Sequence, residues 1–159
     1  MPDAAFFPLA GSPARSLAWV LAALLLSAGI GSYLRDKWSI PLEAALVLLA
    51  GILLVVAWYY PHLVRSLLGY PSWMRQAMTV VLVVPAGFFM GMPFPSGLKL
   101  ISENSGDAVP WMWGVNGGAT VLGSVLAIVL AIHFGFTAVL LLAAAGYCGA
   151  LVLYITRAR

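Results

Sequence analysis

Few side chains in this sequence could carry out chemistry inside a membrane. Glu43 is a carboxylate in the first turn of a long apolar run, and an ionisable group in a membrane helix marks a functional site by default. Its position also suits an interfacial anchor, because a helix N-terminus favours an anion and Arg35 and Lys37 precede it closely. The pattern favours the anchor and leaves a functional carboxylate as the alternative.

The remaining titratable residues do not form a recognisable catalytic or metal-binding pattern. His133 lies near the end of an apolar run, without a carboxylate or a second histidine at ligand spacing. We therefore expect it to cap a helix end or to lie at the interface. No cluster of His, Cys, Asp or Glu has metal-site spacing, so we predict no metal and no cofactor. No nucleophile, base and acid converge within the apolar runs, which argues against an intramembrane enzyme.

Asn116 is the best candidate for a polar pocket, together with Trp111 and Trp113 in the same run, "PWMWGVNGGATVLGS". An amide in a membrane helix usually bonds to a neighbouring helix. Small residues surround it at intervals of four or five, and they predict close helix packing. These packing residues are Gly114, Gly118, Gly123 and Ala127, with Gly149 as the matching position in the next apolar run. The pattern favours plain packing and leaves a ligand pocket as the alternative.

A proline motif, "MGMPFPSGLKL" at residues 90–100, precedes this run. Pro93 and Pro95 each lack an amide donor and push the preceding residue out of the α region. We therefore predict that a helix ends near Met92 and that residues 93–101 form a non-helical segment. This segment is expected to fold back against the start of the next span. The ligand-binding candidates are Glu43, Pro93, Pro95, Trp111, Trp113 and Asn116.

The composition indicates which kind of secondary structure positions these residues. The chain has 159 residues, of which 63% are hydrophobic and 8% charged, whereas soluble domains carry about 25% charged residues. Apolar runs without strict alternation predict helices, since lipid leaves no other partner for the backbone. We predict an all-α polytopic membrane bundle, a single transmembrane domain over residues 1–159. Its five spans cover about residues 16–34, 40–60, 74–92, 111–134 and 136–155, and a tight hairpin joins the last two.

Residues 61–75 are too short and too polar to span, and are expected to form a loop with a short interfacial turn. The net charge of +3 includes no basic run typical of nucleic-acid binding. One side of the predicted bundle carries more positive charge than the other, which places the N-terminus outside and the C-terminus in the cytoplasm. The basic residues of that richer side are Arg35, Lys37, Arg157, Arg159 and Lys99, against Arg15, Arg65 and Arg75 on the other.

Two segments resemble a known family. "GMPFPSGLKLI", followed by "VPWMWGVNGGATVLGSVLAIVLAIHFGFTAVLLLAAAGY", is similar to the C-terminal membrane region of bacterial fused MFS transporter/spermidine synthase proteins. The family pattern reads G-M-P-F-P-x-G-L, a short polar loop, then P-W-x-W-x-x-N-G-x-x-S-V-x-G-S. Thr120 stands where that pattern has serine. The resemblance covers about residues 89–147.

The resemblance implies a bacterial inner-membrane protein, but this chain lacks the glycine-rich loop and the acidic residues of an aminopropyltransferase domain. We therefore expect a membrane module that anchors or cooperates with such a domain on another polypeptide. The alternative is a small transporter, or transporter half, for polyamines or other small metabolites. Because its spans are few for a transporter, that alternative requires a homo-oligomer.

Overall fold

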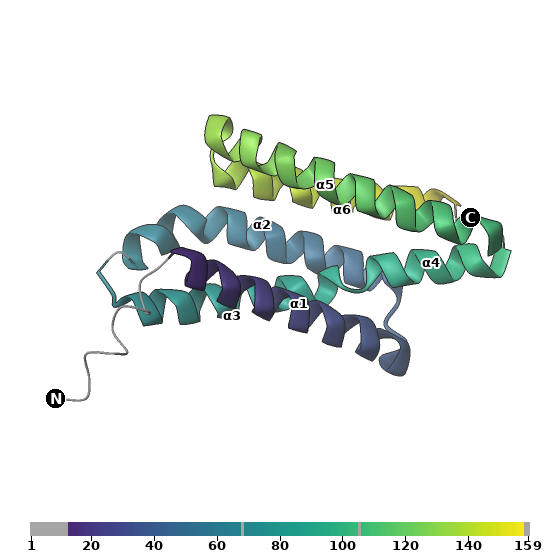
Figure 1. The fold of residues 1–159 in the computed structure, drawn as a ribbon, viewed down its shortest axis with the longest axis horizontal. Helices are drawn as coiled ribbons and strands as arrows, with labels where there is room; N and C mark the ends of the chain where they lie inside the picture. Colours follow the sequence, from purple (N-terminus) through teal and green to yellow (C-terminus); the bar gives the residue numbers. More distant parts are fainter. Residues whose placement is uncertain (1–12, 68, 105, 158–159) are drawn as a thin grey trace.

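The computed structural model describes residues 13–67, 69–104 and 106–157, and these residues are almost entirely helical. The elements are α1 (Pro13–Trp38), α2 (Leu42–Leu67), α3 (Ser72–Met90), α4 (Pro93–Asn104), the short 3-10 helix η3 (Gly106–Ala108), α5 (Val109–Phe134) and α6 (Phe136–Arg157) (Figure 1). Five segments are long and apolar enough to cross a membrane, with α3 and α4 forming one of them. This confirms the all-α polytopic membrane bundle. The segment before Pro13 and the predicted cytoplasmic Arg159 lie outside the described residues.

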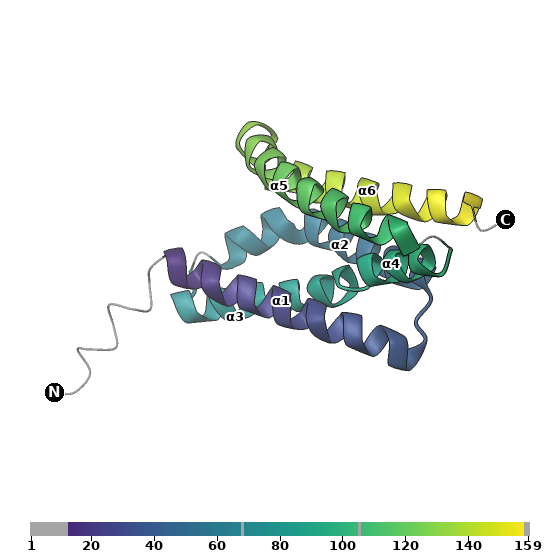
Figure 2. The same ribbon diagram turned by 45° about the vertical axis from the view of Figure 1, so that its right-hand side comes forward.

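The central helix of the bundle is α2. It packs against α3 on one side and α6 on the other, while α1 lies beside α3 and α5 lies beyond α6 (Figures 1 and 2). Leu49 and Leu53 of α2 form the core with Ala144 of α6. Partly buried residues of α3 and α6 close around them, namely Ala86, Phe89, Leu140, Ala143 and Tyr147. The described core is therefore small and depends on α2.

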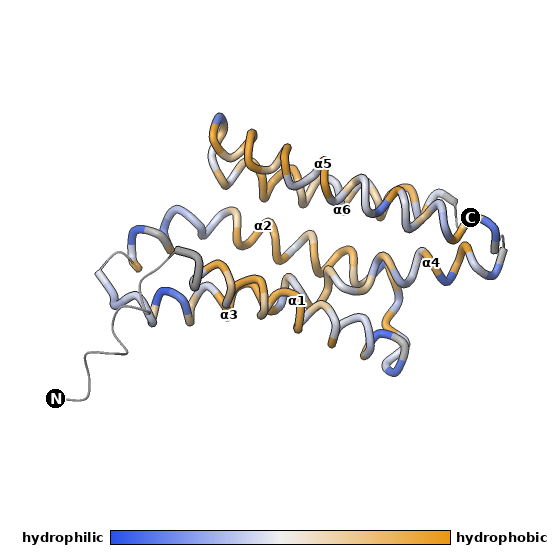
Figure 3. The backbone as a smooth tube through the Cα atoms, viewed as in Figure 1, coloured by the Kyte–Doolittle hydropathy of each residue, from blue (hydrophilic) through white to orange (hydrophobic). Residues whose placement is uncertain are grey.

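Most residues along the spans are hydrophobic (Figure 3), and many large apolar side chains are exposed. Leu25 is 68% exposed and Ile132 is 76% exposed, which would be a large unfavourable surface in water and suits contact with lipid. The hydroxyls of the buried serines bond to backbone carbonyls three or four residues earlier in the chain. Ser27 Oγ donates to the Leu24 carbonyl at 3.0 Å, and Ser96 Oγ donates to the Met92 carbonyl at 2.5 Å. The bundle is thus built to be surrounded by hydrocarbon.

The closest helix approach joins α1 and α3, which run in the same direction (Figures 1 and 2). A Cβ atom added to Gly91 would collide with the backbone of Ala28, and one added to Gly31 would collide with the backbone of Phe88. One added to Gly87 would meet the Ser27 hydroxyl. Glycines let membrane helices approach backbone to backbone. The Gly87-x-x-x-Gly91 pair therefore makes the close contact between helices, whereas the glycines predicted to do so lie in α5 and α6.

The predicted loop at residues 61–75 is wrong in its first half. α2 continues as a helix to Leu67 with Pro61 inside it, and α3 begins at Ser72. Proline is tolerated within a membrane helix because neighbouring groups re-satisfy the backbone around it. The connection between the spans is consequently shorter than polarity alone indicated.

The prediction of a non-helical segment at residues 93–101 is also wrong. α3 ends at Met90, close to the predicted end, but α4 begins at Pro93 after a break of two residues. Pro93 and Pro95 lie in the first turn of α4, where backbone amides lack a helical partner in any case. The prolines therefore start a new helix as well as ending the previous one.

The predicted hairpin between the last two spans is confirmed. Gly135 alone separates α5 from α6, and its φ of 83° lies in the left-handed region that glycine enters without steric cost. Its amide donates to the Ala131 carbonyl at 3.0 Å, and His133 Nδ1 lies 2.8 Å from the Val129 carbonyl. His133 therefore lies in the last turn of α5, and its ring bonds to a carbonyl of its own helix.

Gly91→Ala should destabilise the protein by about 1–3 kcal/mol, because its Cβ would force the α1 and α3 backbones apart. Unfolding in a mixture of mild detergent and dodecyl sulfate measures the change. Gly29→Ala is the matched control on α1, since a Cβ there meets no atom within 4 Å. The control should leave stability unchanged or raise it. Equal losses in both variants would contradict the close approach.

Candidate functional site

The proline motif at the start of α4 contacts the start of α5. The ring of Phe94, between the two prolines of α4, packs edge-to-face on the ring of Trp113, with centroids 4.9 Å apart. Pro93, Phe94 and Pro95 are partly buried, and Ser96 is buried. The proline motif therefore packs beside the start of α5, where it is helical and its contact is with Trp113.

The other candidates around Trp113 do not close a pocket. Trp111 is 77% exposed. Asn116 is also exposed, and its side-chain amide makes no hydrogen bond with a described residue. Its backbone carbonyl accepts a bond from Thr120 Oγ1 at 2.7 Å, and Ser124 Oγ in turn donates to the Thr120 carbonyl at 2.7 Å. The two hydroxyls are thus hydrogen-bonded within α5, whereas the side-chain amide of Asn116 has no hydrogen-bond partner among the described residues.

Glu43 stands apart from this group in the first turn of α2, where it is partly buried. No hydrogen bond or ion pair joins its carboxylate to a residue that the structure describes. The placement is that of a carboxylate at the positive end of a helix.

The glycines predicted to pack in the hairpin have open space beside them within this chain. A Cβ added to Gly114, Gly118, Gly123 or Gly149 would meet nothing within 4 Å, and α5 contains no buried residue. Ala127 is partly buried. Asn116, Thr120, Gly123 and Ala127 share one face of α5 by the 3.6-residue repeat. That face is therefore covered near the Gly135 turn and open toward the start of the helix.

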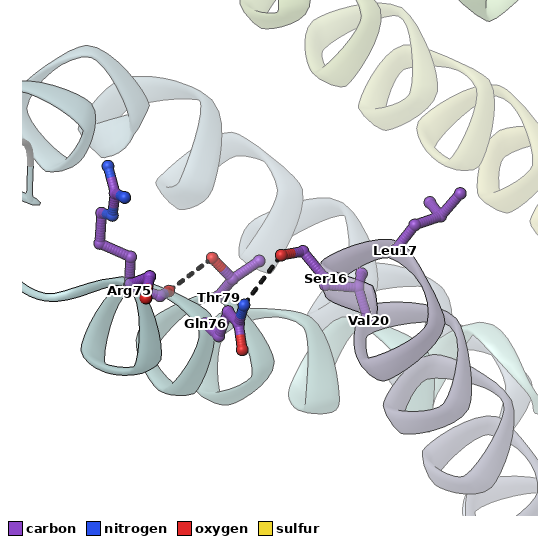
Figure 4. Close-up of a pocket in the computed structure, with 7 residues that line it drawn as sticks. Ser16, Leu17, Val20, Arg75, Gln76 and Thr79 are labelled. Atoms are coloured by element: carbon purple, nitrogen blue, oxygen red, sulfur yellow. Dashed lines mark hydrogen bonds between the residues drawn. The ribbon is translucent and has the colours of Figure 1, made fainter. Parts of the chain in front are cut away.

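A groove with both polar and apolar side chains lies between the N-terminal halves of α1 and α3 (Figure 4). Its volume is about 500 Å³, and it is lined by Ser16, Leu17, Val20, Ser72, Arg75, Gln76 and Thr79. Gln76 Nε2 donates to Ser16 Oγ at 2.9 Å and so bridges the helices. Thr79 Oγ1 donates to the Arg75 carbonyl at 2.9 Å.

The groove can bind, but it does not have the parts for catalysis. Among the residues that the structure describes, no histidine or carboxylate lines it to activate Ser16, and a nucleophilic serine needs an adjacent base. It offers hydroxyls, an amide and the charge of Arg75 at the edge of the membrane. Sequence reasoning missed this groove. The available signal was Gln76, the only glutamine in the chain, lying early in an apolar span.

Comparison of the chain with known protein families, curated proteins and solved structures found no match. Its function is therefore inferred from its own residues and their arrangement. Among the described residues, no three His, Cys, Asp or Glu side chains gather where they could hold a metal ion. The chain is an integral membrane protein with two polar features of note, the open face of α5 and the groove between α1 and α3.

Trp113→Leu should lower the free energy of unfolding by about 0.5–1.5 kcal/mol more than Trp111→Leu does, because only Trp113 stacks on Phe94. Both variants remove an indole from the same end of α5, so the difference isolates the ring pair. Detergent unfolding followed by circular dichroism measures it. A larger loss for Trp111→Leu would show that α4 does not pack through Trp113.

Proposed function

We propose that this chain is a membrane module that assembles through α5 with another membrane segment and holds a synthase-like domain at the inner membrane of a bacterium. The observation that carries the proposal is the unpartnered amide of Asn116 on a helix without buried residues. Asn116 lies about 10 Å along the helix from Val109. An amide at that depth gains by bonding to a neighbouring helix.

The shape of the open face supports the same proposal. Gly123 and Asn116 continue the face that Ala127 begins, and Gly123 leaves room for a backbone to approach. Interhelical contacts in membranes rely on small residues with a polar group to fix the register. A second transmembrane helix, from a partner or from another copy of this chain, fits that requirement.

The synthase-like partner is inferred from the resemblance of residues 89–147 to spermidine-synthase-like membrane proteins. The described residues are taken up by spans and short connections, so aminopropyl transfer would have to come from a separate domain. Arg35, Lys37 and Lys99 all lie at one end of the bundle. By the positive-inside rule that end is cytoplasmic, where a soluble synthase-like domain would work.

Gly123→Leu should disrupt the assembly, because leucine fills the space that a partner backbone would occupy. Asn116→Leu should weaken it roughly three- to thirtyfold, the value of an interhelical hydrogen bond. Gly118→Leu is the matched control, since Gly118 is equally open but lies on a different face of α5. Light scattering in detergent and affinity purification from native membranes measure the assembly.

A monomer in mild detergent, with no synthase-like polypeptide recovered from native membranes, would contradict the proposed function. Equal effects of Gly118→Leu and Gly123→Leu would place any interface on another face.

The groove between α1 and α3 favours a second candidate, transport of a small metabolite. Arg75 is the one charged residue in the groove lining, so a neutral or anionic solute suits it better than a polyamine does. Under this alternative, the groove of one copy is part of a pathway completed by other copies.

If the chain is a transporter, Gln76→Leu should reduce solute flux in liposomes by about tenfold, because it removes a hydrogen-bonding group from the groove. Ser124→Ala, outside the groove, should leave flux unchanged. Flux that is lost in Asn116→Ala but kept in Gln76→Leu would move the pathway to α5. An absence of flux for amines and for carboxylates alike would eliminate the transporter.

A further inference from the structure

Another cavity lies where α1 turns into α2. It is an open pocket of about 290 Å³, lined by Arg35, Ser39, Ile40, Pro41 and Lys99. Arg35 comes from the last turn of α1, whereas Lys99 comes from α4. Two cationic side chains that are distant in the sequence therefore open onto the same small space.

The cavity lies at the edge of the hydrophobic part of the bundle. The first membrane span ends at Arg35, and the second begins at Leu42, one residue after the cavity's Pro41. Trp38 is 60% exposed in the same turn, and exposed tryptophan is typical of the membrane interface. Figure 3 shows hydrophilic residues at the end of α1 and on α4, next to apolar spans. The cavity is thus at the level of the lipid headgroups.

The charges in the cavity suit a phosphate. Arginine presents several N–H donors in a fixed fork, and lysine adds a compact positive charge. The ammonium of Lys99 makes no hydrogen bond or ion pair with a described residue. Among the side chains that the structure describes, the charged groups that line the pocket are Arg35 and Lys99, and both are cations.

We propose that this cavity binds the phosphate of an anionic phospholipid headgroup. Basic pockets between membrane helices are known to take such headgroups. A free phosphate ion would present similar chemistry, but the cavity lies where membrane spans end and where headgroups are concentrated. The site is independent of the assembly proposed for α5, because none of its lining residues belongs to that helix.

The test uses the fact that Lys37 and Lys99 are the only lysines in the chain. The intact protein is placed in nanodiscs of phosphatidylcholine or of phosphatidylglycerol and treated with an amine-acylating reagent. Mass spectrometry then gives the labelling of each lysine. Lys37 is an internal control, because it lies at the same end of α1 but does not line the cavity.

In phosphatidylglycerol, labelling of Lys99 should fall by about fivefold or more, the scale of one basic side chain bound at an anionic surface. Labelling of Lys37 should change much less. Arg35→Gln should restore the labelling of Lys99, whereas Arg75→Gln, at the other end of the bundle, should not. Because the wild-type protein gives the main comparison, a variant that fails to fold does not decide the outcome.

Two further results would overturn the proposal. Equal protection of both lysines would show a general attraction to the charged surface and no defined site, and unchanged labelling of Lys99 would show no binding. An arm with inorganic phosphate in phosphatidylcholine nanodiscs separates the two sources. Protection of Lys99 by that ion, without protection by phosphatidylglycerol, would assign the cavity to a soluble phosphate and overturn the lipid assignment.

Discussion

The close approach of α1 and α3 determines much of the N-terminal part of the bundle. Membrane helices gain little by leaving lipid, so their association depends on packing and on polar contacts. Gly31, Gly87 and Gly91 allow the two backbones to touch near the C-terminal ends of both helices. Arg35 follows Gly31 by one turn, and α4 starts two residues after Gly91. The contact therefore also sets the distance between Arg35 and the helix that carries Lys99.

The opposite ends of the same helices are held differently. There, the bond from Gln76 to Ser16 bridges α1 and α3, and a groove remains beside it. A side-chain bridge holds two helices at a greater separation than glycine packing does. One helix pair thus produces a tight contact toward the basic end and a polar groove toward the other end.

Much of the fold was predictable from the sequence, because span position depends on local apolar length. The spans follow the apolar runs, and the Gly135 hairpin follows from the very short link between two of them. The helix contacts were harder to predict. Gly114-x-x-x-Gly118 and Gly87-x-x-x-Gly91 have the same spacing, yet only the second meets a neighbour. Which glycine pair packs depends on the path of the whole chain, and spacing alone does not rank them.

The proline motif also shows how far the sequence alone can predict the structure at the candidate site. Pro93 and Pro95 mark a helix boundary in either direction, since a proline that cannot continue one helix is well suited to begin another. The chain around them leaves few backbone groups unpaired. The Gly91 amide bonds to the Gly87 carbonyl, and the Ser96 amide bonds to the Met92 carbonyl across the break. The break therefore carries little energetic penalty and lets α4 turn Phe94 toward Trp113. As a result, the start of α5 with Asn116, the proline motif and the basic cavity share one end of the bundle. Under the proposed orientation this is the cytoplasmic end, so a synthase-like domain there would meet α4, while the proposed headgroup binding would hold the same end in the membrane.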